Sequence, residues 1–457
     1  MTWARDRMRD RAWRGLIGWI LCVGLGGCAT GPTEEPGDRS AEREAKPAEA
    51  RSEQCDNGED DDGDGWVDCG DTDCAEGCQP EVVEVAVGGD FVCGRTRRGA
   101  LYCRGGQRGK GPMRVPTSRP YTDIDASLAV LCGVYEESKI ECLDSDDLTA
   151  TDSGGVRPGG WPKDPVDLGA PVEKLSVGRL HACALTEAGR VFCFGRAYER
   201  QSGPAVGRYT HEPVLVPGGP YRSVAAGGNH TCALDKQGRA HCWGSNESGQ
   251  LGVKQVGEGE PKTGEPVRVK GEQRFASIYA GRAHTCGLTD QGRALCWGSN
   301  KNGELGDGQE AEGEEKQERR WGRRRAPGPR PAVTRRHEPG PVAGEETWSY
   351  LALGSHYSCG VTKEGGLRCW GKNASGQLGD GSGWGRLSPV DVATDVNYRQ
   401  LAAGSATICG LDADGGVDCW GRVESMGLRG RARRVAEPEQ LSKPRAREPM
   451  SPQPLLE

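Results

Sequence analysis

The sequence is poor in the residues that build large apolar cores. Hydrophobic residues make up 35% of its 457 residues, and phenylalanine occurs only four times. A single large oily core is therefore not expected. Glycine, by contrast, occurs 72 times, which is typical of many short strands joined by tight turns rather than of helices.

The chain also lacks net positive charge and the common catalytic motifs. Its formal net charge is −7, which argues against a general nucleic-acid binder because phosphate recognition draws on a basic surface. It contains no nucleophile elbow, metalloprotease helix, phosphate-binding loop or redox Cys-x-x-Cys pair. We therefore predict no catalytic residue and no enzymatic activity, with a lyase or hydrolase built from scattered loop residues as the alternative.

Cysteine is abundant, and its spacing is regular. Fourteen of the 20 cysteines form seven pairs with nine residues between the partners. The pairs are Cys93 with Cys103, Cys132 with Cys142, Cys183 with Cys193, Cys232 with Cys242, Cys286 with Cys296, Cys359 with Cys369, and Cys409 with Cys419. Each pair encloses two short strands and a turn, for which Gly238 supplies a flexible residue in the fourth copy. Since opposed Cβ atoms of a hairpin lie roughly 4.5–5.5 Å apart, we predict one cross-strand disulfide per hairpin rather than reduced buried thiols.

The start of the chain predicts export. An arginine-rich segment precedes an apolar run at residues 16–25, which is too short to span a bilayer comfortably and indicates a secretory signal over residues 1–27. The run ends in Leu25-Gly26-Gly27-Cys28, which resembles the lipobox of bacterial lipoproteins. The resemblance implies lipid attachment to Cys28 and an anchor in the bacterial cell envelope, with the outer membrane or cell surface favoured. The alternative is ordinary signal cleavage, which releases a soluble protein.

Two segments separate this signal from the repeats. Residues 28–54 are rich in proline, glutamate and alanine and have no apolar period, so we predict a disordered tether. Residues 55–79 form a module rich in cysteine and aspartate. Its register resembles the aspartate-rich calcium repeats of extracellular proteins such as thrombospondins.

The module predicts one structural Ca²⁺ ion. Calcium prefers six to eight oxygen ligands, and alternate aspartates followed by a glycine turn wrap such ligands around one centre. The expected ligands are Asp60, Asp62, Asp64, the backbone carbonyl of Trp66, Asp68 and Asp71. The alternatives are an acidic linker held by disulfides, whose pairing stays open, and a zinc site, which an oxidising compartment disfavours. Both alternatives use the same four cysteines, Cys55, Cys69, Cys74 and Cys78.

The residues around each cysteine pair also recur. The fourth copy reads Gly227-Gly-Asn-His230-Thr-Cys232-Ala-Leu and then Cys242-Trp243-Gly244-Ser-Asn-Glu-Ser-Gly249-Gln250-Leu251-Gly252. This pattern resembles the regulator of chromosome condensation repeat. The resemblance implies an all-β fold, a seven-bladed β-propeller of four-stranded antiparallel blades, which we place at residues 80–441 with a disordered tail at 442–457. The seven cysteine pairs give the same number of blades independently.

Some copies depart from the pattern, as terminal repeats often do. The departing residues are Phe91, Arg104, Ser127, Leu143, Phe194 and Thr407. Equivalent histidines occur in three copies, at His181, His230 and His284, and we predict structural hydrogen bonds there rather than one shared metal ion. Equivalent tryptophans occur at Trp243, Trp297, Trp370 and Trp420, and we predict packing between blades rather than platforms for sugars.

The gap between the fifth and sixth copies holds a charged insertion at residues 307–345. An acidic block that begins at Glu310 precedes an arginine-rich block around Trp321 and up to Arg336. Because such a segment is too polar to pack, we predict a mobile excursion, either a basic arm for an anionic partner or a self-neutralising loop.

These features predict a monomeric, lipid-anchored, disulfide-braced scaffold that binds an envelope protein or glycan and no nucleic acid. The sequence does not indicate which residues bind the partner. The resemblance implies two narrower alternatives, guanine-nucleotide exchange on a small GTPase and inhibition of an enzyme such as a β-lactamase. Export would keep a cytosolic GTPase out of reach, so the first alternative rests on analogy of fold.

Overall fold

The computed structural model describes residues 82–423, except for 106–112, 116, 118, 129, 145–160, 163, 205–206, 257–260, 311–328, 330, 393 and 395, and also describes the backbone of Glu439–Gln440. The chain divides into two units, residues 1–50 and 51–457, and every described residue belongs to the second. The predicted signal, Cys28, the tether, the calcium module and the predicted tail region lie outside the described residues. None of the described residues forms a helix of the length and hydrophobicity that a bilayer crossing requires.

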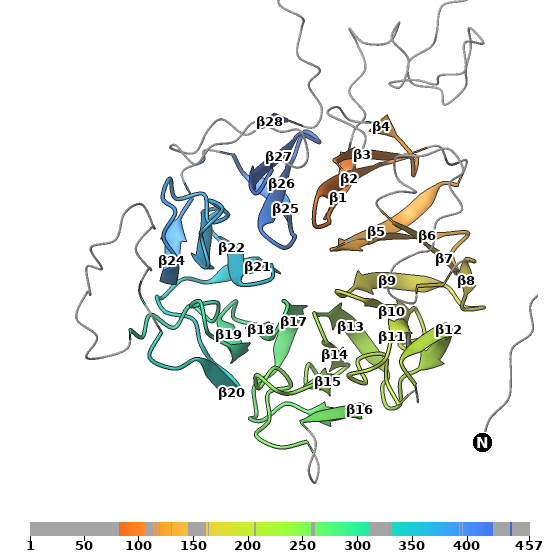
Figure 1. The fold of residues 1–457 in the computed structure, drawn as a ribbon, viewed down its shortest axis with the longest axis horizontal. Coiled ribbons are helices and arrows are strands. Elements are labelled where there is room, and N and C mark those ends of the chain that lie inside the picture. Colours follow the sequence, from red (N-terminus) through yellow and green to blue (C-terminus); the bar gives the residue numbers. More distant parts are fainter. Residues whose placement is uncertain are drawn as a thin grey trace, which may run out of the picture. The chain divides into compact units, whose positions relative to one another are not determined.

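The described residues form seven four-stranded antiparallel sheets, each built from one continuous stretch of chain (Figure 1). Blade 1 contains β1 (Val82–Val87), β2 (Phe91–Thr96), β3 (Leu101–Gly105) and β4 (Met113–Arg114), and blade 2 contains β5 (Tyr121–Ser127), β6 (Val130–Tyr135), β7 (Lys139–Asp144) and β8 (Val166–Asp167). Blade 3 contains β9 (Val172–Val177), β10 (His181–Thr186), β11 (Val191–Arg196) and β12 (Tyr209–Leu215), and blade 4 contains β13 (Tyr221–Ala226), β14 (His230–Asp235), β15 (Ala240–Ser245) and β16 (Lys262–Arg268).

The other three blades follow the same order. Blade 5 contains β17 (Phe275–Ala280), β18 (His284–Thr289), β19 (Ala294–Ser299) and β20 (Arg335–Pro341). Blade 6 contains β21 (Trp348–Leu353), β22 (Tyr357–Thr362), β23 (Leu367–Gly371) and β24 (Arg386–Asp391), and blade 7 contains β25 (Tyr398–Ala403), β26 (Thr407–Asp412), β27 (Val417–Gly421) and β28 (Glu439–Gln440). The predicted seven-bladed, all-β propeller is thus confirmed.

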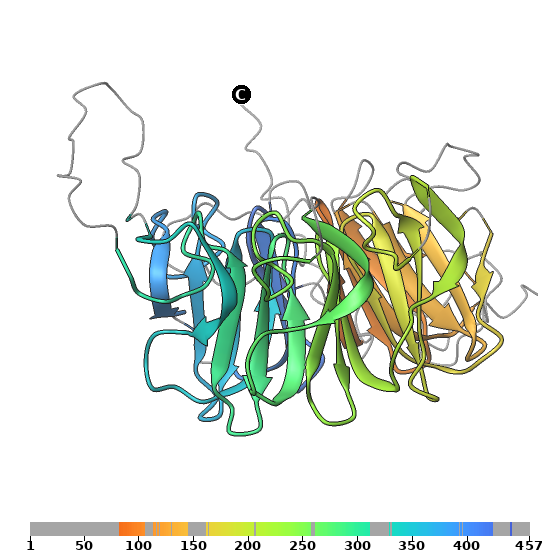
Figure 2. The ribbon, with the colours of Figure 1, turned by 90° about the horizontal axis from the view of Figure 1, so that it is seen from below.

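The first strands of the blades surround the central axis (Figure 1). Each contacts the first strand of the next blade, in the order β1, β5, β9, β13, β17, β21, β25 and back to β1. All strands run between two opposite faces (Figure 2). We call the face with the loops after the first and third strands the turn face, and the face with the second-to-third-strand hairpins the hairpin face.

All seven predicted hairpin disulfides are present, each between the second and third strands of its blade. The bridges join Cys93 to Cys103, Cys132 to Cys142, Cys183 to Cys193, Cys232 to Cys242, Cys286 to Cys296, Cys359 to Cys369, and Cys409 to Cys419. The Cα atoms of the partners lie 4.0–4.1 Å apart, because each cysteine stands directly opposite its partner in the strand register. In blade 4 the adjoining turn contains Gly238, whose φ of +78° disfavours other residues. On a chain-entropy estimate, each bridge contributes about 2–3 kcal/mol to stability.

The apolar core is divided among the blades instead of filling one centre. The described residues contain seven clusters, several of which join two adjacent blades. In one of them, Leu234 of blade 4 packs in the same cluster as Trp297 of blade 5. This arrangement suits a chain with few hydrophobic residues, because each cluster needs only about ten side chains.

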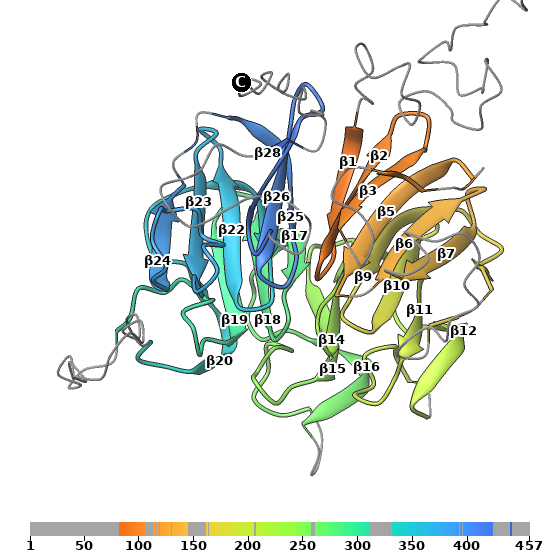
Figure 3. The ribbon, with the colours of Figure 1, turned by 45° about the horizontal axis from the view of Figure 1, so that its top comes forward.

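The ring closes between blades 1 and 7 without a shared strand (Figure 3). As at the other junctions, no strands pair between these two blades. Gln400 of β25 links them through its side chain: its Oε1 accepts a hydrogen bond from Val85 N at 3.0 Å, and its Nε2 donates to Val85 O at 3.1 Å. Arg399 also donates to Val82 O at 2.6 Å. Apolar residues of β1, including Val82 and Val87, pack in one cluster with Leu411 of β26.

The predicted insertion at 307–345 differs in the structure, because its last part belongs to blade 5. β20 pairs with β19, and the Arg336 side chain pairs with Asp307 at 3.0 Å, where the Asp307 side chain is 2% exposed. A polar segment is able to form an outer strand because backbone hydrogen bonds need no apolar side chain, and the buried carboxylate compensates the arginine. Only residues 311–328 and 330 of the insertion lie outside the described part.

We expect Gln400→Ala to lower the stability of the oxidised protein. The substitution removes both hydrogen bonds to Val85, each worth about 1 kcal/mol, so the free energy of unfolding should fall by about 2 kcal/mol. Denaturant unfolding would measure the change. Ser223→Ala is the matched control, because Ser223 has the same register position in blade 4 and makes no cross-blade hydrogen bond among the described residues. Equal losses in the two variants would contradict this account of ring closure.

Candidate functional site

The three equivalent histidines join adjacent blades. Each Nε2 atom lies within hydrogen-bonding distance of a hydroxyl in the next blade, and all three side chains are fully buried. The pairs are His181 with Thr231 at 2.8 Å, His230 with Thr285 at 2.8 Å, and His284 with Ser358 at 3.0 Å. Their structural role was predicted correctly, and burial lowers the pKa of each histidine to about 3.

The equivalent tryptophans are also structural. Three of them are fully buried, and each indole N–H donates to a carbonyl in the preceding blade's loop. The bonds are Trp243 to Gln201 O at 2.9 Å, Trp297 to Gln250 O at 3.0 Å, and Trp370 to Glu304 O at 3.0 Å. These three rings pack between blades, as predicted, and present no face on which a sugar is able to stack. Trp420 is half-buried and packs against the Tyr398 ring, 6.0 Å away between centres.

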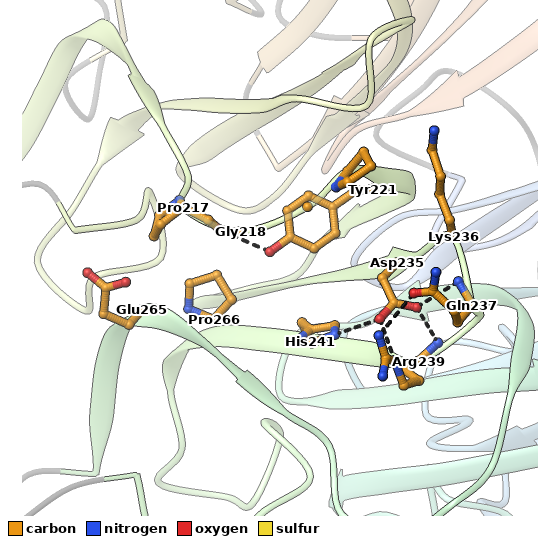
Figure 4. A pocket seen from close by; sticks show the side chains of 12 residues that line it. Pro217, Gly218, Tyr221, Asp235, Lys236, Gln237, Arg239, His241, Glu265 and Pro266 are labelled. Atoms are coloured by element: carbon orange, nitrogen blue, oxygen red, sulfur yellow. Dashed lines mark hydrogen bonds and ion pairs between the residues drawn. The ribbon is translucent and has the colours of Figure 1, made fainter.

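A pocket of ≈ 350 Å³ lies on the hairpin face of blade 4 (Figure 4). Asp235, one of the two carboxylates that line it, accepts hydrogen bonds from the backbone N–H groups of Gln237 and Arg239, from Arg239 Nε at 2.7 Å and from His241 Nε2 at 3.1 Å. Burial alone would raise the pKa of Asp235, but these bonds outweigh it and lower the pKa to about 2. Asp235 thus stabilises a hairpin turn and is poorly placed to act as a general acid or base.

On the turn face, backbone hydrogen bonds join the turns of neighbouring blades. Arg179 N donates to Gly227 O at 3.1 Å, and Gly228 N donates to Arg282 O at 3.1 Å. The loops after the third strands are bonded to the same turns, as Lys372 N donates to His356 O at 2.9 Å. The side chains on these loops therefore project from a fixed backbone.

Six of those side chains form what we call the basic patch. Its members are Arg179, Arg196, Arg282, Lys301, His356 and Lys372. None of them makes an ion pair with a described carboxylate. The five arginine and lysine side chains of the basic patch are thus a concentration of uncompensated positive charge.

Electrostatic interactions show that members of the basic patch lie close together. Burial lowers the pKa of Arg179, and the charges of Arg282 and Arg196 lower it further. Burial likewise lowers the pKa of His356 to about 4, with added repulsion from Arg282, Lys372 and Lys301. Placing like charges together costs free energy, which a bound anion would recover.

Exposed apolar side chains gather on the same face. Tyr198 is 52% exposed in the loop after β11, Trp384 is 41% exposed before β24, and Tyr209 and Val333 lie at the turn-face ends of outer strands. Leu215, at the opposite end of β12, is the exception among the large exposed hydrophobic residues described. Arg196 and Lys262 both lie over the Tyr198 ring, at 5.8 and 4.9 Å from its centre.

Sequence reasoning did not find the basic patch. Arg179 and Arg282 follow the glycine of the Gly-x-x-His pattern in blades 3 and 5. Arg196 and Lys372 follow the glycine after the third-strand aromatic residue. A column-by-column comparison of the copies would have shown basic residues at these two variable positions. Within the described ranges, no three histidine, cysteine, aspartate or glutamate residues are placed to hold a metal ion, and the predicted calcium ligands lie outside those ranges.

Comparison with known proteins identifies the repeat. Residues 172–201, 221–250, 275–304 and 348–377 match the regulator of chromosome condensation (RCC1) repeat, and residues 237–288 match a second description of it. The chain therefore contains RCC1 repeats, in blades 3 to 6. The RCC1 domain-containing mitochondrial protein RUG3 of Arabidopsis thaliana is 29% identical over 225 residues, which are 46% of this chain and 44% of that protein. The chain thus matches less than half of this relative's length.

Two solved structures share the fold. Human WBSCR16 has a TM-score of 0.58 with 17% sequence identity over 72% of this chain and 85% of its own. Prp20p of Saccharomyces cerevisiae has a TM-score of 0.57 with 20% identity over 71% of this chain and 80% of its own. At these identities the likeness concerns the fold alone.

The buried histidines should make the protein acid-sensitive. A histidine in the unfolded chain has a pKa of about 6.5, whereas these three histidines have a pKa of about 3 in the folded protein. Between these two pH values the unfolded state therefore binds more protons than the folded state. The contribution of the neutral histidines to the free energy of unfolding is therefore complete above about pH 6.5. It is lost as pH falls, by up to about 1.4 kcal/mol per pH unit for each histidine.

We expect His230→Gln to reduce the slope of the free energy of unfolding against pH by the equivalent of about one proton. Denaturant unfolding at a series of pH values would measure it, and carboxylate titrations cancel in the difference from the parent protein. His211→Gln, at an exposed position on β12, is the control for loss of a histidine. A slope unchanged in His230→Gln would show that His230 does not stay neutral in the folded state.

Proposed function

We propose that this RCC1-like propeller is a non-catalytic binding scaffold whose turn face receives a partner protein with an acidic surface. The observation that carries the proposal is the basic patch, in which five Arg and Lys side chains and His356 have no acidic partner among the described residues. A protein chain of net charge −7 has many carboxylates with which to neutralise such a patch. Leaving it uncompensated favours a negatively charged partner.

The exposed aromatic residues support a protein partner over a simple anion. Arginine, tyrosine and tryptophan dominate the binding energy of protein interfaces, and Tyr198 and Trp384 lie on the same face as the arginines. Bonds between neighbouring turns hold the backbone of this face before any partner arrives. Less conformational freedom is then lost on binding, which favours affinity.

The fold supports the same proposal by analogy. Prp20p, which shares the propeller fold, has been described with its binding to Gsp1p and histones. Folds of this kind are therefore able to serve protein recognition, although the partner of one propeller does not identify that of another.

We further propose that the scaffold works outside the cytoplasm, anchored to the cell envelope through Cys28. Seven hairpin disulfides support this location, because disulfides persist in oxidising compartments. The apolar run at residues 16–25 and the Cys28 motif are the sequence basis for export and lipidation. A structural Ca²⁺ ion at Asp60 to Asp71 remains part of the proposal.

Lipidation has a direct test in cells. The full chain should incorporate radiolabelled palmitate and partition into the membrane fraction, because acyl chains bury apolar surface in the bilayer. Cys28→Ser should abolish both the label and the partitioning, while Cys22→Ser, within the predicted signal, should retain them. Label retained in Cys28→Ser would reject this anchor without affecting the proposed role of the turn face.

The turn face is tested with poly-L-glutamate as a defined acidic probe. We expect the oxidised protein to bind it at low salt, and Arg179→Glu/Arg282→Glu to weaken binding by about tenfold or more. Lys236→Glu/Arg293→Glu is the matched control, because both residues are exposed on hairpin-face turns and the change in net charge is the same. Biolayer interferometry would measure the affinities.

The same pair of variants tests a native partner. A protein cross-linked to the parent chain at the cell envelope should be retained by the hairpin-face variant and lost by the turn-face variant. Equal weakening by both variants would reduce the effect to net charge and reject the turn face as the binding surface. Recovery of an anionic glycan in place of a protein would reject a protein partner.

A further inference from the structure

Two members of the basic patch approach each other closely enough to share a ligand. Arg282 Nη1 lies 3.4 Å from His356 Nε2, and the two residues belong to adjacent turns of blades 5 and 6. Their backbones are held in place, since Arg282 N donates to Gly354 O and Lys372 N donates to His356 O. Arg282 is exposed and His356 is half-buried, so the pair opens to solvent.

The hydrogen bond between the two side chains depends on whether His356 carries a proton on Nε2, because Arg282 is always protonated. When His356 is neutral, its Nε2 atom accepts a hydrogen bond from Arg282. A proton on Nε2 would abolish that bond and place a second positive charge beside the guanidinium. The groups that face His356 are the cations Arg282, Lys301 and Lys372, each from a different loop or turn, and no described carboxylate offsets them.

An anion changes this balance. A carboxylate or phosphate oxygen placed between the side chains would accept one hydrogen bond from Arg282 and another from a protonated His356 Nε2. Its negative charge would also offset the repulsion from Lys301 and Lys372. A protonated His356 beside Arg282 is therefore unfavourable without a ligand and becomes favourable when the anion is bound.

We propose that Arg282 and His356 form a two-pronged site for one oxyanion of the partner, and that His356 takes up a proton when the oxyanion binds. The inference rests on the proposed function of the turn face and specifies its anchor point. The proton comes from solvent and is added to the Nε2 lone pair, and no other covalent bond changes. The ligand group is a carboxylate of an acidic side chain or a phosphate.

The site predicts that affinity rises as pH falls. His356 is neutral in the free protein down to about pH 4, whereas the bound anion raises its pKa. Between the pKa of His356 in the free protein and its pKa in the complex, binding is accompanied by uptake of as much as one proton. The affinity therefore increases by up to about tenfold for each pH unit by which the pH is lowered. Above the pKa of His356 in the complex, His356 is neutral with and without the anion, and its protonation no longer changes the affinity.

Sulfate is the first probe, because it remains a dianion between about pH 4.5 and 7 and its own charge does not contribute to the slope. Nuclear magnetic resonance of the oxidised full chain, labelled at histidine, would follow the His356 ring as a function of pH with and without sulfate. We expect sulfate to raise the His356 pKa, and Arg282→Gln to abolish the increase. No change in the His356 pKa in saturating sulfate would overturn the proposal.

Calorimetry with acidic and phosphorylated peptides then distinguishes carboxylate from phosphate. Titrations in two buffers of different ionisation enthalpy give the number of protons taken up, which should be about one higher for the parent chain than for His356→Gln, because any proton exchanged by the peptide itself is common to both. His211→Gln is the control and should keep the proton uptake of the parent. The same uptake in His356→Gln and the parent would overturn the role of His356.

The outcomes separate this proposal from the broader one. If poly-L-glutamate fails to bind but sulfate raises the His356 pKa, the oxyanion site stands and the acidic partner protein is rejected. If poly-L-glutamate binds through Arg179 and Arg282 without proton uptake, the turn face stands and the two-pronged site is rejected.

Discussion

The hydrogen bonds that cross from one blade to the next are the interaction on which this structure depends, because a single repeat does not bury its apolar face without its neighbours. His230 shows the pattern: its ring bonds to Thr285 in the next blade, and that hydroxyl donates to the carbonyl of Gln250. The indole N–H of Trp297 donates to the same carbonyl, so one loop of blade 4 is fixed by two residues of blade 5. These groups are buried, and loss of the Thr285 hydroxyl would leave His230 Nε2 without its hydrogen-bond partner.

The same kind of bond explains how the turn face holds positive charges together. A flexible loop would move Arg179 away from Arg282 and relieve their repulsion. Here turns of neighbouring blades are bonded to one another, and loops after third strands are bonded to the turn of their own blade. The free energy that folds the ring thus also maintains an unfavourable charge arrangement, which a partner of opposite charge stabilises.

The sequence specified those features that repeat from copy to copy. The seven blades, the hairpin disulfides and the roles of His181, His230 and His284 follow from regular spacing, because each copy places the same residues at the same register. Features that depend on contacts between distant segments were not predictable in this way. Gln400 bonds to Val85, which lies 315 residues away in the chain, only because β25 meets β1. β20 forms from arginine-rich sequence only because β19 offers an open edge.

The basic patch lies between these two cases. Its backbone positions repeat from blade to blade, but its side chains do not: Arg179 and Arg282 have Gly228 and Ser355 as counterparts in blades 4 and 6. The fold tolerates a glycine or a serine at that position, so packing does not require an arginine there. The identical positions of a repeat protein report how the ring is held together, whereas the positions that vary on a shared backbone report what the ring binds. By that reasoning, the pairing of Arg282 with His356 is a property of this chain and not of its fold, and its chemistry indicates an oxyanion.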